Sequence, residues 1–161
     1  MISDKRVVKI VPCFPYTSKR GKAATNSPTS YHEWEANIKD LIDAEINVNP
    51  GCKMDVILYL RIEPGRDIET NRARAFLSNY DEIKIANGIL YVVETSNDQT
   101  YGFGILKDLL TSKYVINYTH FIYQEDDIYI LKDGTDNYVL DALELNKPIV
   151  PFITYGRVGT F

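Results

Sequence analysis

Short runs of apolar residues, separated by amphipathic and polar stretches, recur along the chain. A β-branched run over residues 6–14 stops among prolines and predicts a first strand. The run over 53–62 is apolar without interruption at its centre, over 56–60, as expected for a strand that is covered on both faces of a sheet. Three later runs read as further strand material, at 83–95, 120–124 and 148–155.

Between these runs, apolar residues return at helical spacing. The clearest case covers residues 30–46, where Ser30 and Glu33 form a capping-box pattern ahead of the apolar positions. Shorter helices are predicted at 68–79, 100–114 and 138–146. Inside the run over 83–95, Asn87 and Gly88 predict a turn between two strand segments.

Strand and helix therefore alternate four times, which is typical of an α/β fold. We expect a single domain over residues 1–161, with a mostly parallel central sheet flanked by helices. We see no internal repeat, low-complexity stretch or interdomain linker. In such sheets, ligands bind beyond the carboxyl ends of the strands, so the segments that follow the strands are the first place to look for function.

Composition narrows the choice of partners. Hydrophobic residues make up 45% of the chain and charged residues 25%, which predicts a compact globular protein. The formal net charge of −4 argues against nucleic acid as a partner. The opening apolar segment is too short for a signal peptide or a membrane span, so we expect a cytoplasmic protein. Two cysteines without a CxxC pattern predict neither a disulfide framework nor a zinc site.

Three carboxylates in a row, Glu125, Asp126 and Asp127, follow the run at 120–124. On an extended backbone Glu125 and Asp127 leave on the same face, and Asp126 points the other way. Two oxygen ligands on one face suit Mg²⁺ or Mn²⁺, which take the rest of their ligands from water and substrate phosphates. The alternative is that the strand ends at Gln124 and the acids form a solvated turn. Burying one unpaired carboxylate costs several kcal/mol, so something should offset that cost, and a cation held by the three acids could do so.

Two further segments have both a structural and a functional interpretation. Residues 97–104 place amides and two glycines at the start of a predicted helix, where free N–H groups favour an anion, although the glycines also suit a plain helix cap. The basic run at 18–22 is either a solvated loop or an arm for a diphosphate. His32 and His120 match no metal-ligand spacing and are expected to be structural.

Four stretches together carry a resemblance to a known family: "VVKIVPCFPY", "VILYLRIEPG", "SNDQTYGFGILKDLL" and "HFIYQEDDIYIL". With the helix at 30–46, they are similar to the nucleotide-sugar-binding half of GT-A glycosyltransferases. That family likewise opens on a strand that ends near proline and later has an apolar strand that ends in an acidic DxD-type motif. The resemblance covers about residues 6–130, and residues 131–161 would form a short acceptor-binding or closing part.

The resemblance implies a metal-dependent transferase that moves a sugar from a UDP- or GDP-sugar donor to an acceptor hydroxyl. Glu125 and Asp127 would hold Mn²⁺ or Mg²⁺. The donor would be bound by residues from all the strand ends, namely Pro12, Tyr16, Glu63, Asn97, Asp98, Gly102, Gly104 and Asp126. The catalytic base would come from the acids that follow, with Asp136 and Asp133 as the candidates we select and Asp141 and Glu144 as the others.

Several alternatives stay open at this point. Because about thirty residues follow the acidic motif, the chain is a minimal transferase, one completed by a second copy or a partner subunit, or a donor-binding relic without activity. The stretch "DGTDNYVLDAL" also resembles the DxDN helix of RusA-type Holliday-junction resolvases, which use Mg²⁺ to cleave DNA. A third interpretation is a non-catalytic α/β interaction protein.

Overall fold

The computed structural model describes residues 6–15, 31–62, 65, 67–95, 112–126 and 133–134. Within these ranges the chain forms, in order, β1 (Val7–Cys13), α2 (Tyr31–Asn47), β2 (Met54–Arg61), α3 (Asp67–Leu77), β3 (Ile83–Ile85), β4 (Gly88–Thr95) and β5 (His120–Tyr123). Each element predicted inside the described ranges is present, with its bounds shifted by one or two residues.

Some predicted elements cannot be compared with the structure. The predicted helix at 138–146 and strand at 148–155 lie outside the described residues, as does Ser30 of the predicted capping box. Most of the helix predicted at 100–114 also lies outside them. Its last three residues, 112–114, form a bend and a turn, so the prediction was too long at that end.

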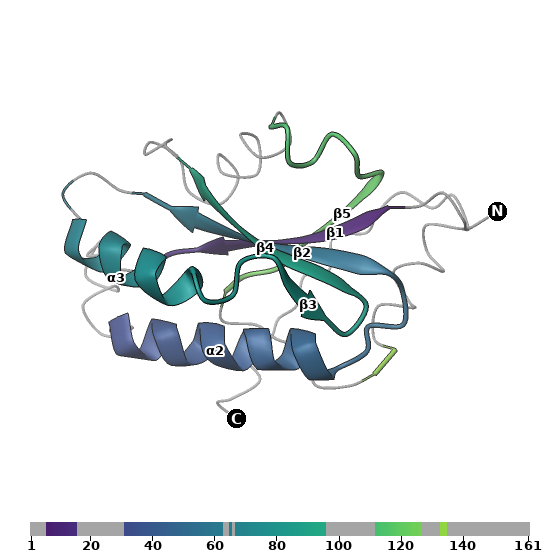
Figure 1. The fold of residues 1–161 in the computed structure, drawn as a ribbon, viewed down its shortest axis with the longest axis horizontal. Coiled ribbons are helices and arrows are strands. Elements are labelled where there is room, and N and C mark those ends of the chain that lie inside the picture. Colours follow the sequence, from purple (N-terminus) through teal and green to yellow (C-terminus); the bar gives the residue numbers. More distant parts are fainter. Residues whose placement is uncertain are drawn as a thin grey trace, which may run out of the picture.

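The described strands form one mixed sheet in the order β3-β4-β2-β1-β5 (Figure 1). β1 pairs in parallel with β2 on one side and with β5 on the other, and β2 pairs in parallel with β4. β3 pairs antiparallel with β4 at one edge of the described sheet. The predicted α/β class with a mostly parallel sheet is confirmed.

The antiparallel β3–β4 hairpin turns at Ala86 and Asn87, one residue before the position predicted from sequence. The Met54 backbone N–H donates to the Asn87 carbonyl at 3.0 Å, which brings the turn close against the start of β2. A Cβ atom at Gly88 would overlap the carbonyl oxygen of Met54. Gly88 is therefore required by the close approach of two backbones rather than by the turn itself.

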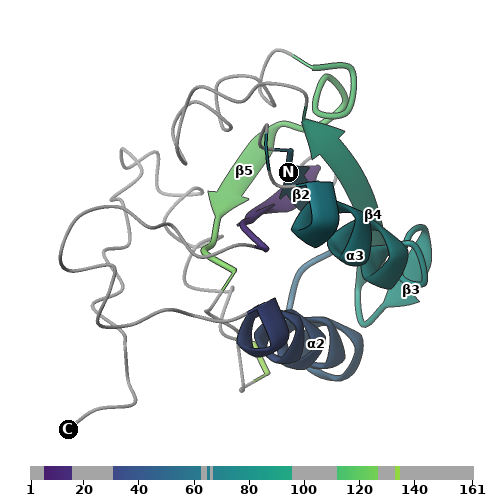
Figure 2. The same ribbon diagram turned by 90° about the vertical axis from the view of Figure 1, so that its left-hand side faces the viewer.

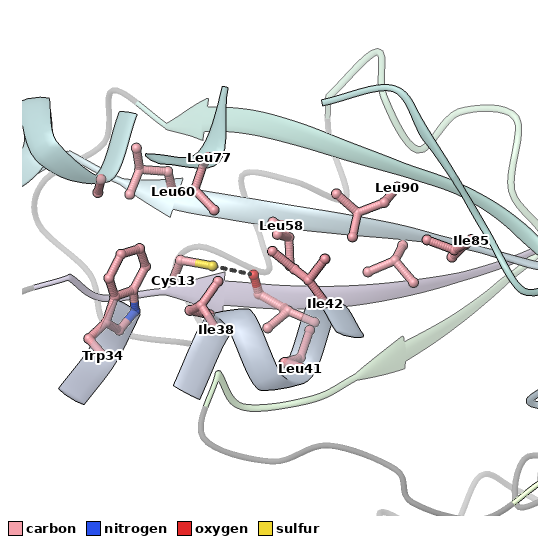
Figure 3. Packing of buried hydrophobic residues seen from close by; sticks show 13 residues of the cluster. Cys13, Trp34, Ile38, Leu41, Ile42, Leu58, Leu60, Leu77, Ile85 and Leu90 are labelled. Carbon is pink, nitrogen blue, oxygen red and sulfur yellow. Dashed lines mark hydrogen bonds between the residues drawn. The ribbon is translucent and has the colours of Figure 1, made fainter. Parts of the chain in front are cut away.

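Both helices cover the same face of the sheet (Figure 2). Trp34, Ile38, Leu41 and Ile42 of α2 pack with Ala73 and Leu77 of α3 against alternate residues of the strands (Figure 3). A second buried cluster, which includes Ile10 and Tyr59, lies on the opposite face. β2 is thus covered on both faces, as its apolar run predicted. No helix among the described residues is both long and apolar enough to cross a membrane.

The middle of the sheet contains a buried ion pair between Lys9 of β1 and Glu45 of α2. The Lys9 Nζ atom lies 2.7 Å from Glu45 Oε1, and the two side chains are 1% and 5% exposed. Breaking such a pair leaves one charge buried without its partner, which costs far more than the net stability that the intact pair contributes. Lys9 and Glu45 therefore depend on each other.

We expect Glu45→Gln to lower the free energy of unfolding by about 3–5 kcal/mol, because the Lys9 ammonium would stay buried without a counter-charge. The double variant Lys9→Met with Glu45→Leu should recover most of this loss. Lys39→Met is the control, since it breaks the Lys39–Asp43 pair, whose side chains are 57% and 48% exposed. Urea unfolding followed by circular dichroism measures all three. A Glu45→Gln variant no less stable than Lys39→Met would contradict the prediction.

Gly88→Ala should destabilise the protein by about 1–3 kcal/mol, because the new methyl group forces the start of β2 and β4 apart. Gly65→Ala is a comparison with a different origin of strain. At Gly65 nothing lies within 4 Å of the added atom, but its φ of +79° should cost about 1–2 kcal/mol. Thermal unfolding measures both, and a melting temperature for Gly88→Ala equal to that of the unmodified protein would show that the hairpin adjusts freely.

Candidate functional site

The order of the strands reverses at β1. From β1 the chain passes to β2 and then β4 on one side of it, whereas β5 pairs with its other side. Such a reversal is the topological switch point of an open α/β sheet, and ligands bind there beyond the carboxyl ends of the strands. The place to look for a site is therefore the segment after β1 together with the segment after β5.

The acidic residues come directly after β5, which ends at Tyr123. The backbone N–H of Gln124 still donates to the Ile10 carbonyl of β1 at 3.0 Å, and the Gln124 side chain is buried. Glu125 is exposed and Asp126 is half-buried. The strand ends before the acids, so neither Glu125 nor Asp126 is a residue of a buried strand.

Asp126 has partners on two other elements. Its Oδ2 atom accepts a hydrogen bond of 2.9 Å from the backbone N–H of Phe14, which follows β1. The same atom accepts a second bond of 2.9 Å from the indole Nε1–H of Trp34 in α2. Because α2 covers one face of the sheet, Asp126 is directed to that face. These two donors offset the cost of placing the Asp126 carboxylate in a partly buried position.

Trp34 itself is held firmly by the core. Its side chain is 4% exposed and meets the ring of Phe76 edge-on, with 6.3 Å between ring centres and 71° between ring planes. Figure 3 shows Trp34 of α2 beside Cys13 at the end of β1. The sequence pattern assigned Trp34 only to the apolar face of a helix. It did not reveal that the indole N–H would bind an acid 92 residues away.

The charges of the acids act on two neighbouring side chains. Burial and, secondarily, the charge of Asp126 raise the pKa of the Cys13 thiol well above its usual value. Burial, followed by the charges of Glu125 and Asp126, raises the pKa of Tyr123. Cys13 therefore stays protonated near neutral pH and is not an activated nucleophile.

A buried positive charge also lies at the carboxyl ends of the strands, on β2, which is the neighbour of β1. Arg61 is the last residue of β2 and is 2% exposed. Its guanidinium carbon lies 5.7 Å from the centre of the Phe14 ring, within the range of a cation–π contact. Sequence reasoning assigned no role to Arg61. The only signal was a charged residue inside the apolar run of β2.

Three of the residues predicted for the site lie within the described part of the chain, on or after neighbouring strands. Pro12 is a buried residue of β1, close in sequence to Phe14, which binds Asp126, and Glu125 is adjacent to Asp126. Most of the other predicted site residues lie outside the described part of the chain, namely Tyr16, Glu63, Asn97, Asp98, Gly102, Gly104, Asp127 and Asp136.

Asp133, one of the two predicted catalytic bases, lies near the amino end of β2. The acids after β5 lie at the other end of the strands, beyond their carboxyl ends. The Oδ1 atom of Asp133 accepts a hydrogen bond of 2.8 Å from the backbone N–H of Asn49, between α2 and β2. The N–H of Gly134 donates to the Asn49 carbonyl at 2.8 Å. Figure 1 shows this short segment beside the end of α2, whereas Asp126 contacts its beginning. The structure does not bring Asp133 and Asp126 together.

Within the ranges that the structure describes, no three His, Cys, Asp or Glu side chains are grouped so that they could hold a metal ion. Asp126 already accepts two hydrogen bonds, and Glu125 is exposed. A Mg²⁺ or Mn²⁺ site can nevertheless use only one or two carboxylates, with phosphates and water as its other ligands. Such a site would depend on Glu125 and Asp127.

Comparison of the chain with protein-family models, with curated proteins and with solved structures found no match. We therefore infer the function from the geometry of the strand ends.

Asp126→Ala should lower the free energy of unfolding by about 1–3 kcal/mol, because the N–H groups of Phe14 and Trp34 lose their acceptor. Glu125→Ala is the matched control. It removes a neighbouring carboxylate that is exposed, so its effect should stay within about 0.5 kcal/mol. Urea unfolding measures both variants. Equal stability of the two would show that the Asp126 hydrogen bonds contribute nothing measurable.

Proposed function

We propose that the protein is a metal-dependent glycosyltransferase with a GT-A-type donor-binding domain. It would move a sugar from a nucleoside-diphosphate donor to an acceptor hydroxyl. The observation that carries the proposal is the position of the acidic segment at the topological switch point. The parallel strands β4, β2, β1 and β5 are third, second, first and fourth along the chain. The nucleotide-binding doubly wound order begins 3-2-1-4 and binds its ligand at the same switch.

The charges at this edge support the same proposal. A nucleoside diphosphate needs a neutralising cation, and an acidic segment at the switch point provides oxygen ligands for one. Glu125 is exposed and adjacent to Asp126, so its carboxylate is accessible from solution. The buried Arg61, at the carboxyl end of β2, places a positive charge at the same end of the sheet. The nucleotide base would lie near the end of β1, where Pro12, Phe14 and Tyr16 are the neighbouring residues.

In the proposed reaction Glu125 and Asp127 would hold Mn²⁺ or Mg²⁺, whose chemical contribution is to offset the charge that develops on the departing diphosphate. The acceptor hydroxyl oxygen forms a bond to the anomeric carbon as the bond from that carbon to the diphosphate oxygen breaks. The hydroxyl proton passes to a carboxylate of the chain. Asp136 and Asp133 are the candidates for this base, and in the structure Asp133 binds Asn49 near the amino end of β2.

A thermal-shift screen with UDP, GDP, CMP and dTDP, each with and without Mn²⁺, tests the proposal. A ligand that binds only the folded state at a hundredfold excess over its Kd stabilises the protein by about 2.7 kcal/mol. For a chain of this length that is a rise of roughly 5–10 °C in melting temperature. We expect one nucleoside diphosphate to give this rise only when Mn²⁺ is present.

Glu125→Ala should lose the shift that depends on both Mn²⁺ and the nucleotide, because it removes one of the two proposed ligands. Asp55→Ala is the control at the amino end of β2, far along the strand from the proposed site. A shift with branched DNA and Mg²⁺ would instead support the junction-nuclease alternative. No shift with any nucleotide would contradict the transferase and favour an interaction protein.

A further inference from the structure

The turn of the β3–β4 hairpin ends in the single Asn-Gly pair of the chain, Asn87 and Gly88. Such a pair is chemically labile, because glycine has no side chain to keep the asparagine amide carbon away from the glycine backbone nitrogen. Asn87 is half-buried, and Gly88 pairs with Ile85 across the hairpin. The rate of reaction between the two groups therefore depends on how the structure holds this turn.

The side chain of Asn87 is bound by Asn49, in the segment between α2 and β2. The Gly51 N–H donates to Asn49 Oδ1 at 2.8 Å, so this oxygen is an acceptor. Asn87 Nδ2 lies 2.6 Å from the same oxygen and donates to it. The Asn87 carbonyl also accepts a hydrogen bond of 3.0 Å from the Met54 N–H. Asn87 is thus bound through both its side chain and its backbone.

We propose that Asn87 is a site of spontaneous deamidation and that its contact with Asn49 slows this reaction in the folded protein. The Gly88 backbone nitrogen loses its proton to water and forms a bond to Cγ of Asn87. The bond from Cγ to the side-chain nitrogen breaks, and that nitrogen takes up a proton from water and leaves as ammonia. Water then opens the cyclic succinimide to aspartate or isoaspartate. The reaction needs only water and is independent of the proposed donor-binding site.

Two features of the closed turn oppose the attack. In a two-residue turn, the residue after the turn commonly donates its N–H to the carbonyl of the residue before it, which engages the Gly88 nitrogen. The hydrogen bond to Asn49 fixes the direction of the Asn87 amide, whose carbon has to approach that nitrogen. Asn49 itself is exposed, so the contact opens locally without unfolding of the sheet. Deamidation therefore proceeds from the open turn.

The product cannot restore the contact with Asn49. Aspartate at position 87 has no hydrogen to donate to Asn49 Oδ1. It also brings a second carboxylate to Asn49, whose backbone N–H already donates to Asp133 Oδ1 at 2.8 Å. Isoaspartate in addition inserts a side-chain carbon into the backbone and displaces the carbonyl that Met54 binds. Deamidation is thus a one-way change that weakens the attachment of the hairpin to the segment before β2.

The experiment incubates the full chain at neutral pH and measures aspartate and isoaspartate at position 87 by mass spectrometry of its peptides over time. Asn49→Ala should deamidate at Asn87 about fivefold faster, because the closed turn loses one hydrogen bond of ordinary strength. Asn49→Asp keeps an oxygen acceptor for Asn87 and should stay within about twofold of the unmodified rate. Asn47→Ala is the matched control, since that side chain binds the Asp43 carbonyl within α2, and its rate should be unchanged. The chain unfolded in guanidinium gives the rate without any structure.

Each contrary outcome overturns a definite part of the proposal. If the folded chain stays unchanged at Asn87 while the unfolded chain is converted, Asn87 is not a deamidation site of the folded protein. If Asn49→Ala reacts at the unmodified rate, the contact with Asn49 does not slow the reaction. If Asn47→Ala accelerates it as much as Asn49→Ala does, a general loss of stability explains the effect. If aspartate forms without isoaspartate, water hydrolyses the amide directly and Gly88 does not attack it.

Discussion

The parallel pairing of β1 with β2 on one side and with β5 on the other is the constraint on which the rest of this structure depends. All seven residues of β1 are buried. Any polar side chain on it must therefore find a partner inside the protein, as Lys9 does with Glu45. Because both pairings are parallel, the ends of the three strands meet at one edge. The parallel pairing of these three strands therefore determines where the candidate site lies.

Helix α2 is fixed to the sheet by polar contacts at two places in addition to its apolar stripe. Glu45, near its carboxyl end, pairs with Lys9 at the middle of the sheet, and Trp34, near its beginning, donates to Asp126 at the carboxyl edge. Hydrophobic packing alone tolerates small shifts of a helix along a sheet, whereas buried polar pairs do not. The position of the segment after β5 thus depends on the position of α2 on the sheet.

The elements that the sequence predicted correctly are those with a strong local signal. The mainly apolar run of β2 and the helical spacing of α2 both depend on neighbours within a few residues, so their bounds came within one residue of the structure. The hairpin turn was displaced by one residue, because the glycine there serves contact with Met54 and not the turn. The Asn87-Gly88 pair correctly indicated a turn nearby. The glycine itself, however, is required by its contact with Met54, which is distant in sequence.

For the candidate site, the sequence by itself determined which chemical groups are available and that the acids follow an apolar strand. It also determined the fold class, since hydrophobic periodicity reports which faces are buried. Only the tertiary structure decided that β5 lies beside β1, that Asp126 binds Phe14 and Trp34, and that Asp133 lies near the amino end of β2. Such contacts join residues separated by about a hundred positions in the chain, and no local pattern encodes which of them will meet.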